Sequence, residues 1–122
     1  MEPGSSQLIS HVQQGVTIVH FSDAKVIDQR NINLIGAELT EMVDKGAVRK
    51  MLINLEDVQY LSSAVLGKFI SLHKALKMQH GVLKLCTIGG PIFEVFEITR
   101  LDRVFQIYDT EEEALTAFRL GK

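Results

Sequence analysis

Apolar positions recur along this chain with two different periods, and the change from one period to the other predicts its fold. Residues 8–21 hold two short β-rich runs that a polar Gln-Gln-Gly segment separates, which is typical of two neighbouring strands. From about Asp28 the apolar residues recur every three or four positions, which indicates a helix with one buried face. Strand-like and helix-like segments then alternate to the C-terminus.

The alternation predicts the element order ββαβαβαβα. The expected strands are Leu8–Val12, Val16–Phe21, Lys50–Leu55, Val82–Ile88 and Val104–Tyr108. The expected helices run from about Asp28 to Lys45-Gly46, over Ser63–Gln79 with Gly81 just past its end, from Pro91 to about Thr99, and onward from a capping-box sequence at Thr110. Strands that alternate with helices predict an α/β fold whose sheet is mostly parallel, with an antiparallel edge from the opening pair.

Two of these helices have a clear buried stripe. The first stripe is Ile32, Ile35, Leu39, Met42 and Val43, and the second is Val65, Leu66, Phe69, Leu72 and Leu76. Each set falls on one face of a helix, which predicts that both helices pack against the sheet.

Composition indicates a single small globular domain but does not indicate its function. The 122 residues suit one domain, 1–122, of which 1–6 read as a flexible tail. The net charge of −2 is spread over interspersed acids and bases, so we expect no nucleic acid as partner. No apolar run reaches membrane-spanning length, and the N-terminus lacks the regions of a signal peptide. The lone Cys86 agrees with a reducing cytoplasm, where we expect it to be a buried, inert thiol.

The most informative chemistry lies in the stretch from Lys50 to Lys77. An apolar strand leads into an acidic turn and then into Ser62 and Ser63, where an amphipathic helix begins. One interpretation is helix capping, in which a serine oxygen accepts from an unpaired amide. The other is phosphorylation, because a helix N-terminus tolerates a phosphate that would add up to about two negative charges to the surface. The two interpretations are compatible.

Other polar groups give weaker signals. Asn54, Glu56 and Asp57 precede the serines, and carboxylates in such a turn are usually solvated. His73 and His80 are seven residues apart, and exposed polar histidines are the preferred interpretation. We therefore expect no metal and no cofactor. No histidine or nucleophile elbow accompanies the serines, so catalysis is not expected.

The residues of this stretch resemble the STAS family, the anti-sigma factor antagonists of bacteria. The family carries a strand followed by a pattern like L-D-L-S-x-V-x-F-[IM]-D-S-S-G-L-G, and residues 55–67 here read LEDVQYLSSAVLG. Residues 93–115 (FEVFEITRLDRVFQIYDTEEEAL) are similar to the family's C-terminal helix, strand and acidic cap. The likeness covers about Leu8 to Leu120. It implies the STAS fold, with a mostly parallel sheet of four to five strands, an antiparallel N-terminal edge strand and four helices.

The resemblance also implies a site. Ser63 matches the serine that a partner kinase phosphorylates, with Ser62 as the alternative acceptor. The sequence departs from the family at four positions: Ser62 and Asn54 stand where Asp is usual, Ala64 where a second Ser is common, and Val65 where Gly is found, while Leu66 and Gly67 keep the family's identity. The implied partner-binding residues are Asn54, Asp57, Ser62, Ser63, Ala64, Val65, Gly67 and Lys68.

The function that the family implies is partner switching by a protein that is not an enzyme. The partners would be an anti-sigma factor with serine/threonine kinase activity and, transiently, a serine phosphatase; the chain itself would be a monomer or a weak dimer. Two alternatives stay open. One is a STAS scaffold or assembly module that is never phosphorylated, and the other is a small-molecule or nucleotide binder on the same α/β layout.

Overall fold

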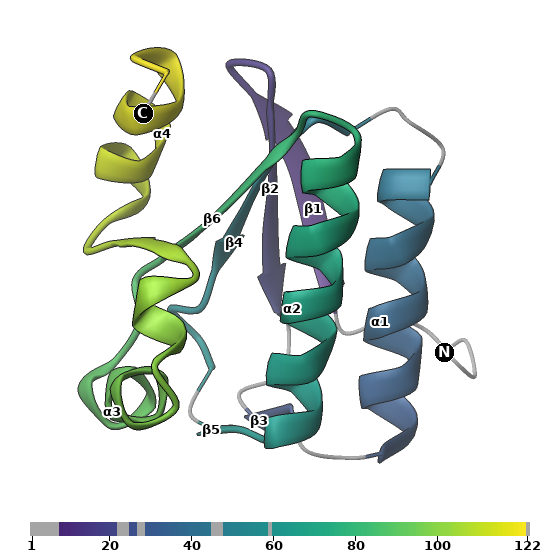
Figure 1. Cartoon of the computed structure of the whole chain (residues 1–122), viewed down its shortest axis with the longest axis vertical. Coiled ribbons are helices and arrows are strands. Elements are labelled where there is room, and N and C mark those ends of the chain that lie inside the picture. The colour runs from purple at the N-terminus through teal and green to yellow at the C-terminus, as the bar shows by residue number, and fades with distance from the viewer. Residues whose placement is uncertain (1–7, 22–24, 27–28, 45–47, 59, 122) are drawn as a thin grey trace.

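The computed structural model describes residues 8–21, 25–26, 29–44, 48–58 and 60–121. Five strands form one sheet in the order β1-β2-β4-β6-β7 (Figure 1). These strands are β1 (Leu8–Gln13), β2 (Val16–Phe21), β4 (Lys50–Asn54), β6 (Val82–Cys86) and β7 (Gln106–Tyr108). β1 runs antiparallel to β2, and every other pair in the sheet is parallel. The predicted α/β fold with an antiparallel N-terminal edge is confirmed.

Four α-helices occur within the described ranges, as predicted. They are α1 (Gln29–Asp44), α2 (Ser63–Met78), α3 (Gly90–Ile98) and α4 (Glu111–Arg119). α1 and α2 lie side by side over one face of the sheet, and α4 lies beside the other face (Figure 1). The predicted tail at 1–6, the Asp28 cap and the Lys45-Gly46 helix end lie outside the described residues.

The central strands β4 and β6 are buried on both faces because their side chains alternate between two cores. In β4, Met51 and Ile53 belong to the larger core under α1, α2 and α3, whereas Leu52 belongs to the smaller core under α4. Leu83 and Cys86 divide β6 in the same way. This two-sided burial explains why these strands appear in the sequence as continuous apolar runs.

Some boundaries differ from the predictions for local reasons. β6 ends at Cys86 because Thr87 adopts a left-handed conformation with φ 59°, which breaks the strand before Ile88. The expected strand at 104–108 is shorter, since the 3₁₀ helix η1 (Leu101–Arg103) and the following turn precede β7. Two-residue strands β3 (Lys25–Val26) and β5 (Tyr60–Leu61) pair in parallel as a separate small sheet, which the sequence analysis missed.

The C-terminal end of α2 shows why a glycine follows it. His80, not Gly81, takes the left-handed conformation, with φ 62°. The Gly81 amide donates to the Leu76 carbonyl, and a Cβ at Gly81 would lie 2.7 Å from the Arg49 carbonyl oxygen. Gly81 is therefore required by close backbone approach, and His80 lies beyond the helix that carries His73.

Lys84 is fully buried in the middle of β6, facing α4, which an apolar strand pattern does not predict. Its ammonium group donates to the Gln106 side chain and lies 5.4 Å from the ring centre of Tyr108 and 5.0 Å from that of Phe118. Burial lowers the pKa of the Lys84 ammonium group. The two rings and the amide oxygen partly replace the water that the charge has lost.

The prediction that His73 is an exposed polar histidine is wrong. The His73 ring packs edge-on against Phe105, with 5.5 Å between ring centres, and its Nδ1 is buried without a hydrogen-bond partner among the described residues. Burial, and secondarily the nearby positive charge of Lys77, lower the pKa of His73 below its ordinary value of 6.5. His73 thus joins α2 to the turn after η1 as a largely apolar contact.

This shift predicts a pH dependence of stability. Because the pKa of His73 is lower in the folded chain, the unfolded chain binds a proton first as the pH falls through about 6.5, and the folded state loses free energy relative to it. We expect the free energy of unfolding to decline with falling pH below about 7 and this slope to be reduced in His73→Gln. Urea unfolding at several pH values measures it, with the exposed His80→Gln as control. Equal slopes in His73→Gln and His80→Gln would contradict the assignment.

Candidate functional site

Backbone hydrogen bonds and strand pairing hold the strand, turn and helix that surround Ser63. β4 ends at Asn54, and the Val58 amide donates to the Leu55 carbonyl at 3.1 Å, which closes a turn. The chain then passes through β5, which pairs with β3, and α2 begins at Ser63. Glu56 and Asp57 are exposed on this turn, as expected for solvated carboxylates.

Ser62 is the N-cap of α2. It has extended backbone angles, and its Oγ accepts a hydrogen bond from the Val65 amide at 3.2 Å. The Ser62 carbonyl accepts from the Leu66 amide and so begins the helical hydrogen-bond pattern. The capping interpretation of the serine pair therefore holds for Ser62, which is half-buried.

Ser63 occupies the first helical position and is exposed. Its hydroxyl has no hydrogen-bond partner among the residues that the structure describes. Ala64 and Gly67 are also exposed, and Lys68 is half-buried. Because residues three and four positions apart lie on one helix face, Gly67 adjoins Ser63 and Ala64, and Lys68 adjoins Ala64, so these residues form one surface. We call the set Asp57, Ser62, Ser63, Ala64, Gly67 and Lys68 the Ser63 surface.

Two residues that the family pattern implies as partner contacts do not extend this surface. Val65 is 1% exposed and packs in the larger core, so bulk at this position is accommodated inside the protein. Asn54 is 4% exposed, and its side chain is already hydrogen-bonded within the fold. Neither side chain can offer a partner direct contact area, so the surface is narrower than the family pattern implies.

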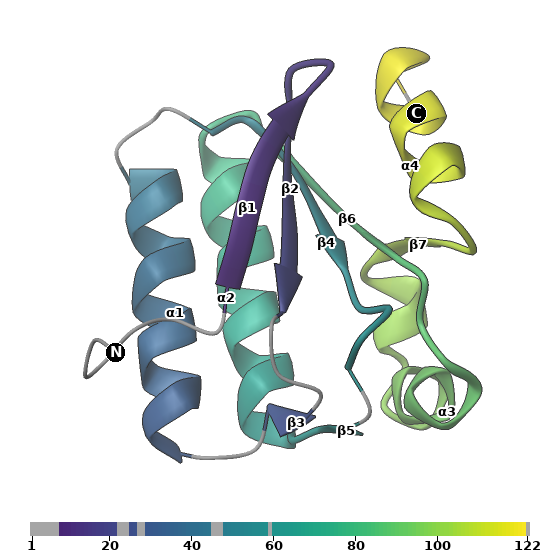
Figure 2. The same ribbon diagram turned by 180° about the vertical axis from the view of Figure 1, so that it is seen from behind.

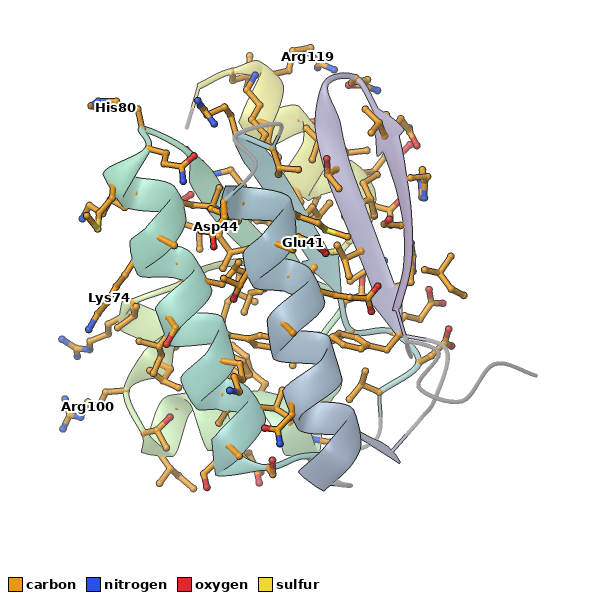
Figure 3. The ribbon with its side chains drawn as sticks, turned by 90° about the vertical axis from the view of Figure 1, so that its right-hand side faces the viewer. Glu41, Asp44, Lys74, His80, Arg100 and Arg119 are labelled. Atoms are coloured by element: carbon orange, nitrogen blue, oxygen red, sulfur yellow. The ribbon has the colours of Figure 1, made fainter. Side chains whose placement is uncertain are left out.

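Lys68 connects the Ser63 surface to α1. Its aliphatic stem crosses Gly36, where an added Cβ would lie 2.8 Å from Cδ of Lys68. An open groove of about 650 Å³ follows the line between the two helices. Its walls include Lys68 and Ser71 on α2 and Glu41 and Asp44 on α1. Figure 3 labels Glu41 and Asp44. The groove gives the Ser63 surface a polar extension along α2.

Asn54 joins the turn before Ser63 to α4. Its Oδ1 accepts from the Glu56 amide at 2.8 Å, and its Nδ2 donates to Oε1 of Glu111 at 2.8 Å. The first bond fixes the start of the acidic turn, and the second ties it to the first turn of a helix 57 residues later in the sequence. Asn54 is thus a structural junction beneath the turn that leads to Ser63.

Histidines extend this junction across the sheet. Nε2 of His20 lies 3.4 Å from Oε1 of Glu111, and the His20 and His11 rings stack with 5.9 Å between their centres. An open pocket of about 390 Å³ lies beside these side chains. Its lining includes His20, Asn54 and Thr87 together with acidic residues. Within the described ranges, no three His, Cys, Asp or Glu side chains are arranged to hold a metal ion.

Sequence reasoning found Ser62, Ser63 and Asn54 but missed the roles of His20 and Glu111. The only available signal was the capping box at Thr110, which is confirmed because Oγ1 of Thr110 accepts from the Glu113 amide at 3.1 Å. That signal places Glu111 in the first turn of a helix, but it does not indicate that Glu111 contacts Asn54 and His20 on the sheet. Cys86 is buried as expected, and burial raises the pKa of its thiol to about 11.

Comparison with known proteins agrees with this architecture. The STAS domain family matches residues 7–114. The anti-sigma-B factor antagonist of Bacillus subtilis is 30% identical over 96 residues, which cover 79% of this chain and 86% of that protein. The solved anti-sigma-factor antagonist (STAS) domain protein of Planctomyces limnophilus is 25% identical with a TM-score of 0.78, covering 90% of this chain and 96% of that one.

A further solved structure shares the fold. SpoIIAA of Bacillus, in its phosphorylated form, is 20% identical with a TM-score of 0.72, covering 91% of this chain and 98% of that one. The fold and the site together thus define a small STAS-type α/β protein. The chain belongs to the STAS domain family, and the relatives to which it is similar include anti-sigma factor antagonists. None of its described helices has the length and apolar character needed to cross a bilayer.

The two serines should differ in their effect on stability. Ser62→Ala removes the oxygen that caps α2 and should lower the free energy of unfolding by about 1 kcal/mol. Ser63→Ala removes an exposed hydroxyl without a described partner and should change it by less than about 0.5 kcal/mol. Chemical denaturation of both variants measures the difference. A larger loss in Ser63→Ala than in Ser62→Ala would contradict the assignment of the cap.

The Asn54–Glu111 contact predicts an interaction between two variants. Asn54→Asp keeps an acceptor for the Glu56 amide but sets a second carboxylate against Glu111 at a 4% exposed position, so we expect a loss of about 1–3 kcal/mol. Adding Glu111→Gln should recover part of the loss, because the glutamine amide can donate to the aspartate. Glu112→Gln, a change at the exposed neighbour, is the matched control. If Glu111→Gln and Glu112→Gln restore the same free energy of unfolding to Asn54→Asp, residues 54 and 111 make no specific contact.

Proposed function

We propose that this protein is an anti-sigma factor antagonist that works by partner switching in the cytoplasm. Unphosphorylated, it binds an anti-sigma factor with serine/threonine kinase activity through the Ser63 surface, and the bound anti-sigma factor releases its sigma factor. The kinase then phosphorylates Ser63, the complex separates, and a serine phosphatase restores the binding form. The protein is a substrate in this cycle and not an enzyme, and it controls transcription through the sigma factor.

The exposure of Ser63 is the observation that carries this proposal. The neighbouring Ser62 caps the helix, so the Ser63 hydroxyl is not needed for the fold. A kinase can therefore reach this oxygen and modify it without breaking the cap. Ser62, the alternative acceptor, is half-buried and its oxygen is engaged with the Val65 amide, which makes Ser63 the preferred site.

Local electrostatics favour a phosphate at this position in the free protein. The first turn of α2 contains no acidic residue, and the unpaired amides and helix dipole there attract an anion. In a complex the same phosphate has the opposite effect. Up to about two negative charges would be desolvated at a closely packed contact, and an unpaired desolvated charge costs several kcal/mol. Phosphorylation thus weakens binding while leaving the fold intact.

The relatives support the same assignment. An antagonist of the anti-sigma-B factor is 30% identical to this chain over most of its length. SpoIIAA, which shares the fold, has a phosphorylated form. By analogy with these proteins, we assign an anti-sigma factor as the partner.

The test is a phosphorylation assay with the cognate anti-sigma kinase and ATP. We expect intact-protein mass spectrometry to show one added phosphate on the wild type and on Ser62→Ala, but none on Ser63→Ala. Ser62→Ala is the matched control because it alters the neighbouring hydroxyl and leaves Ser63 available. An unmodified wild-type protein, with the kinase shown to be active on another substrate, would refute phosphorylation. A phosphate retained in Ser63→Ala but lost in Ser62→Ala would assign the phosphorylation to Ser62 instead.

The departures from the family motif favour a second candidate, a STAS scaffold that binds its partner without a phosphate cycle. Ser62 keeps the cap but lacks the charge of the aspartate that the family usually has beside the acceptor serine. Affinity measurements with the purified anti-sigma factor separate the two candidates. Partner switching predicts weaker binding for Ser63→Asp than for wild type and Ser63→Ala, whereas a scaffold predicts equal affinities.

A further inference from the structure

The outermost strand β1 has an open edge that nothing in the described structure covers. β1 is the first strand in the sheet order and pairs along its whole length with β2 alone. Its outward backbone amides and carbonyls are therefore available to another strand. Figure 2 shows β1 in front, with α2 behind it, α1 to its left, and α4 at the right beyond β6.

The side chains of β1 do not protect this edge. All of those that the structure describes, from Ile9 to Gln13, are exposed, and the apolar Ile9 and Val12 are 56% and 70% exposed. The strand sequence LISHVQ contains no lysine, acidic residue, proline or glycine. Edge strands are usually guarded by such residues, by bulges or by being short. The opposite edge, β7, is indeed only three residues long.

We propose that β1 is a homodimerisation edge, at which the β1 strands of two copies pair antiparallel and join the two sheets into one. A strand without formal charge at neutral pH meets its own copy without like-charge repulsion. The edge supplies hydrogen-bond donors and acceptors in equal measure, so a two-fold axis between the strands satisfies both copies at once. A second copy is the partner whose edge is complementary by symmetry.

The sheet geometry restricts the register of this pairing. His11 lies opposite Ile18, which packs under α4, whereas Ser10 lies opposite Val19, which packs in the other core. A two-fold axis perpendicular to the sheet keeps each face on its own side, so only residues of the same face can be opposite each other. The register centred on Ser10 meets this condition, with Ile9 of each copy opposite His11 of the other.

The proposed interface is small, so we expect the affinity between the two copies to be low. One six-residue strand from each copy buries less than the roughly 1,200–2,000 Å² that specific, stable complexes bury. We therefore expect a weak dimer whose fraction rises with protein concentration. The edge is separate from the Ser63 surface, which lies at the start of α2. The proposal therefore does not depend on the proposed function, and the dimer leaves both copies of the Ser63 surface open.

Sedimentation velocity or light scattering over a wide concentration range tests the proposal. The wild-type mass should rise from 13.6 kDa towards twice that value. Val12→Lys should remain monomeric at all concentrations, since each copy would bring a lysine charge into the paired edge, which carries no acidic residue to neutralise it. Ile98→Lys, at an apolar position of α3 that is 79% exposed, is the matched control and should dimerise like the wild type. Circular dichroism confirms that each variant is folded, and Ile9→Lys replaces Val12→Lys if the latter is not.

Hydrogen exchange identifies the contact. The outward-facing amides of β1, which alternate with those that face β2, should exchange more slowly at high than at low wild-type concentration, and at equal rates in Val12→Lys. A wild-type mass that stays at 13.6 kDa throughout would overturn the proposal. A dimer that persists in Val12→Lys and Ile9→Lys, or one without added protection of β1, would show that the copies meet through another surface.

Discussion

The burial of β4 on both of its faces is the constraint on which the rest of this structure depends. Its apolar residues serve two cores at once, so the strand cannot shift along its neighbours without exposing one set or the other. The point at which the chain leaves the sheet is thereby set at Asn54. Everything that follows, the acidic turn, the short β5 and the start of α2, is built outward from that point.

Asn54 converts this constraint into a defined turn. It is a buried polar residue at the end of an apolar strand, and each end of its amide has a partner on a different segment. One partner is the turn that leads to Ser63, and the other is Glu111 of α4. A buried amide with both ends satisfied specifies one arrangement more strictly than apolar contacts do, since any shift leaves a polar group unpaired. α4, on one face of the sheet, thus helps to orient the turn that leads to α2 on the other face.

Local signals in the sequence were enough for the order of the main elements and for the caps at Ser62 and Thr110. Hydrophobic period, the Thr110 capping box and the serines before an amphipathic stripe each depend on residues within a few positions. The errors concern contacts that only the folded chain brings together. His73 appears polar in the sequence but meets Phe105, Lys84 is buried under two distant rings, and Glu111 reaches Asn54 across 57 residues. The β3–β5 pairing is equally non-local and too short to show a pattern.

Under the proposed function, the first turn of α2 separates two tasks that a single serine could not perform together. The cap must keep its oxygen on the Val65 amide, because a helix start without that bond leaves an unpaired donor. A modifiable hydroxyl must instead be free to leave the surface and enter an active site. Ser62 performs the first task and Val65 anchors the turn in the core, so the phosphate that we propose on Ser63 would change the charge there while the backbone remains fixed. A change in charge at such a position alters what the surface can bind with little effect on the fold.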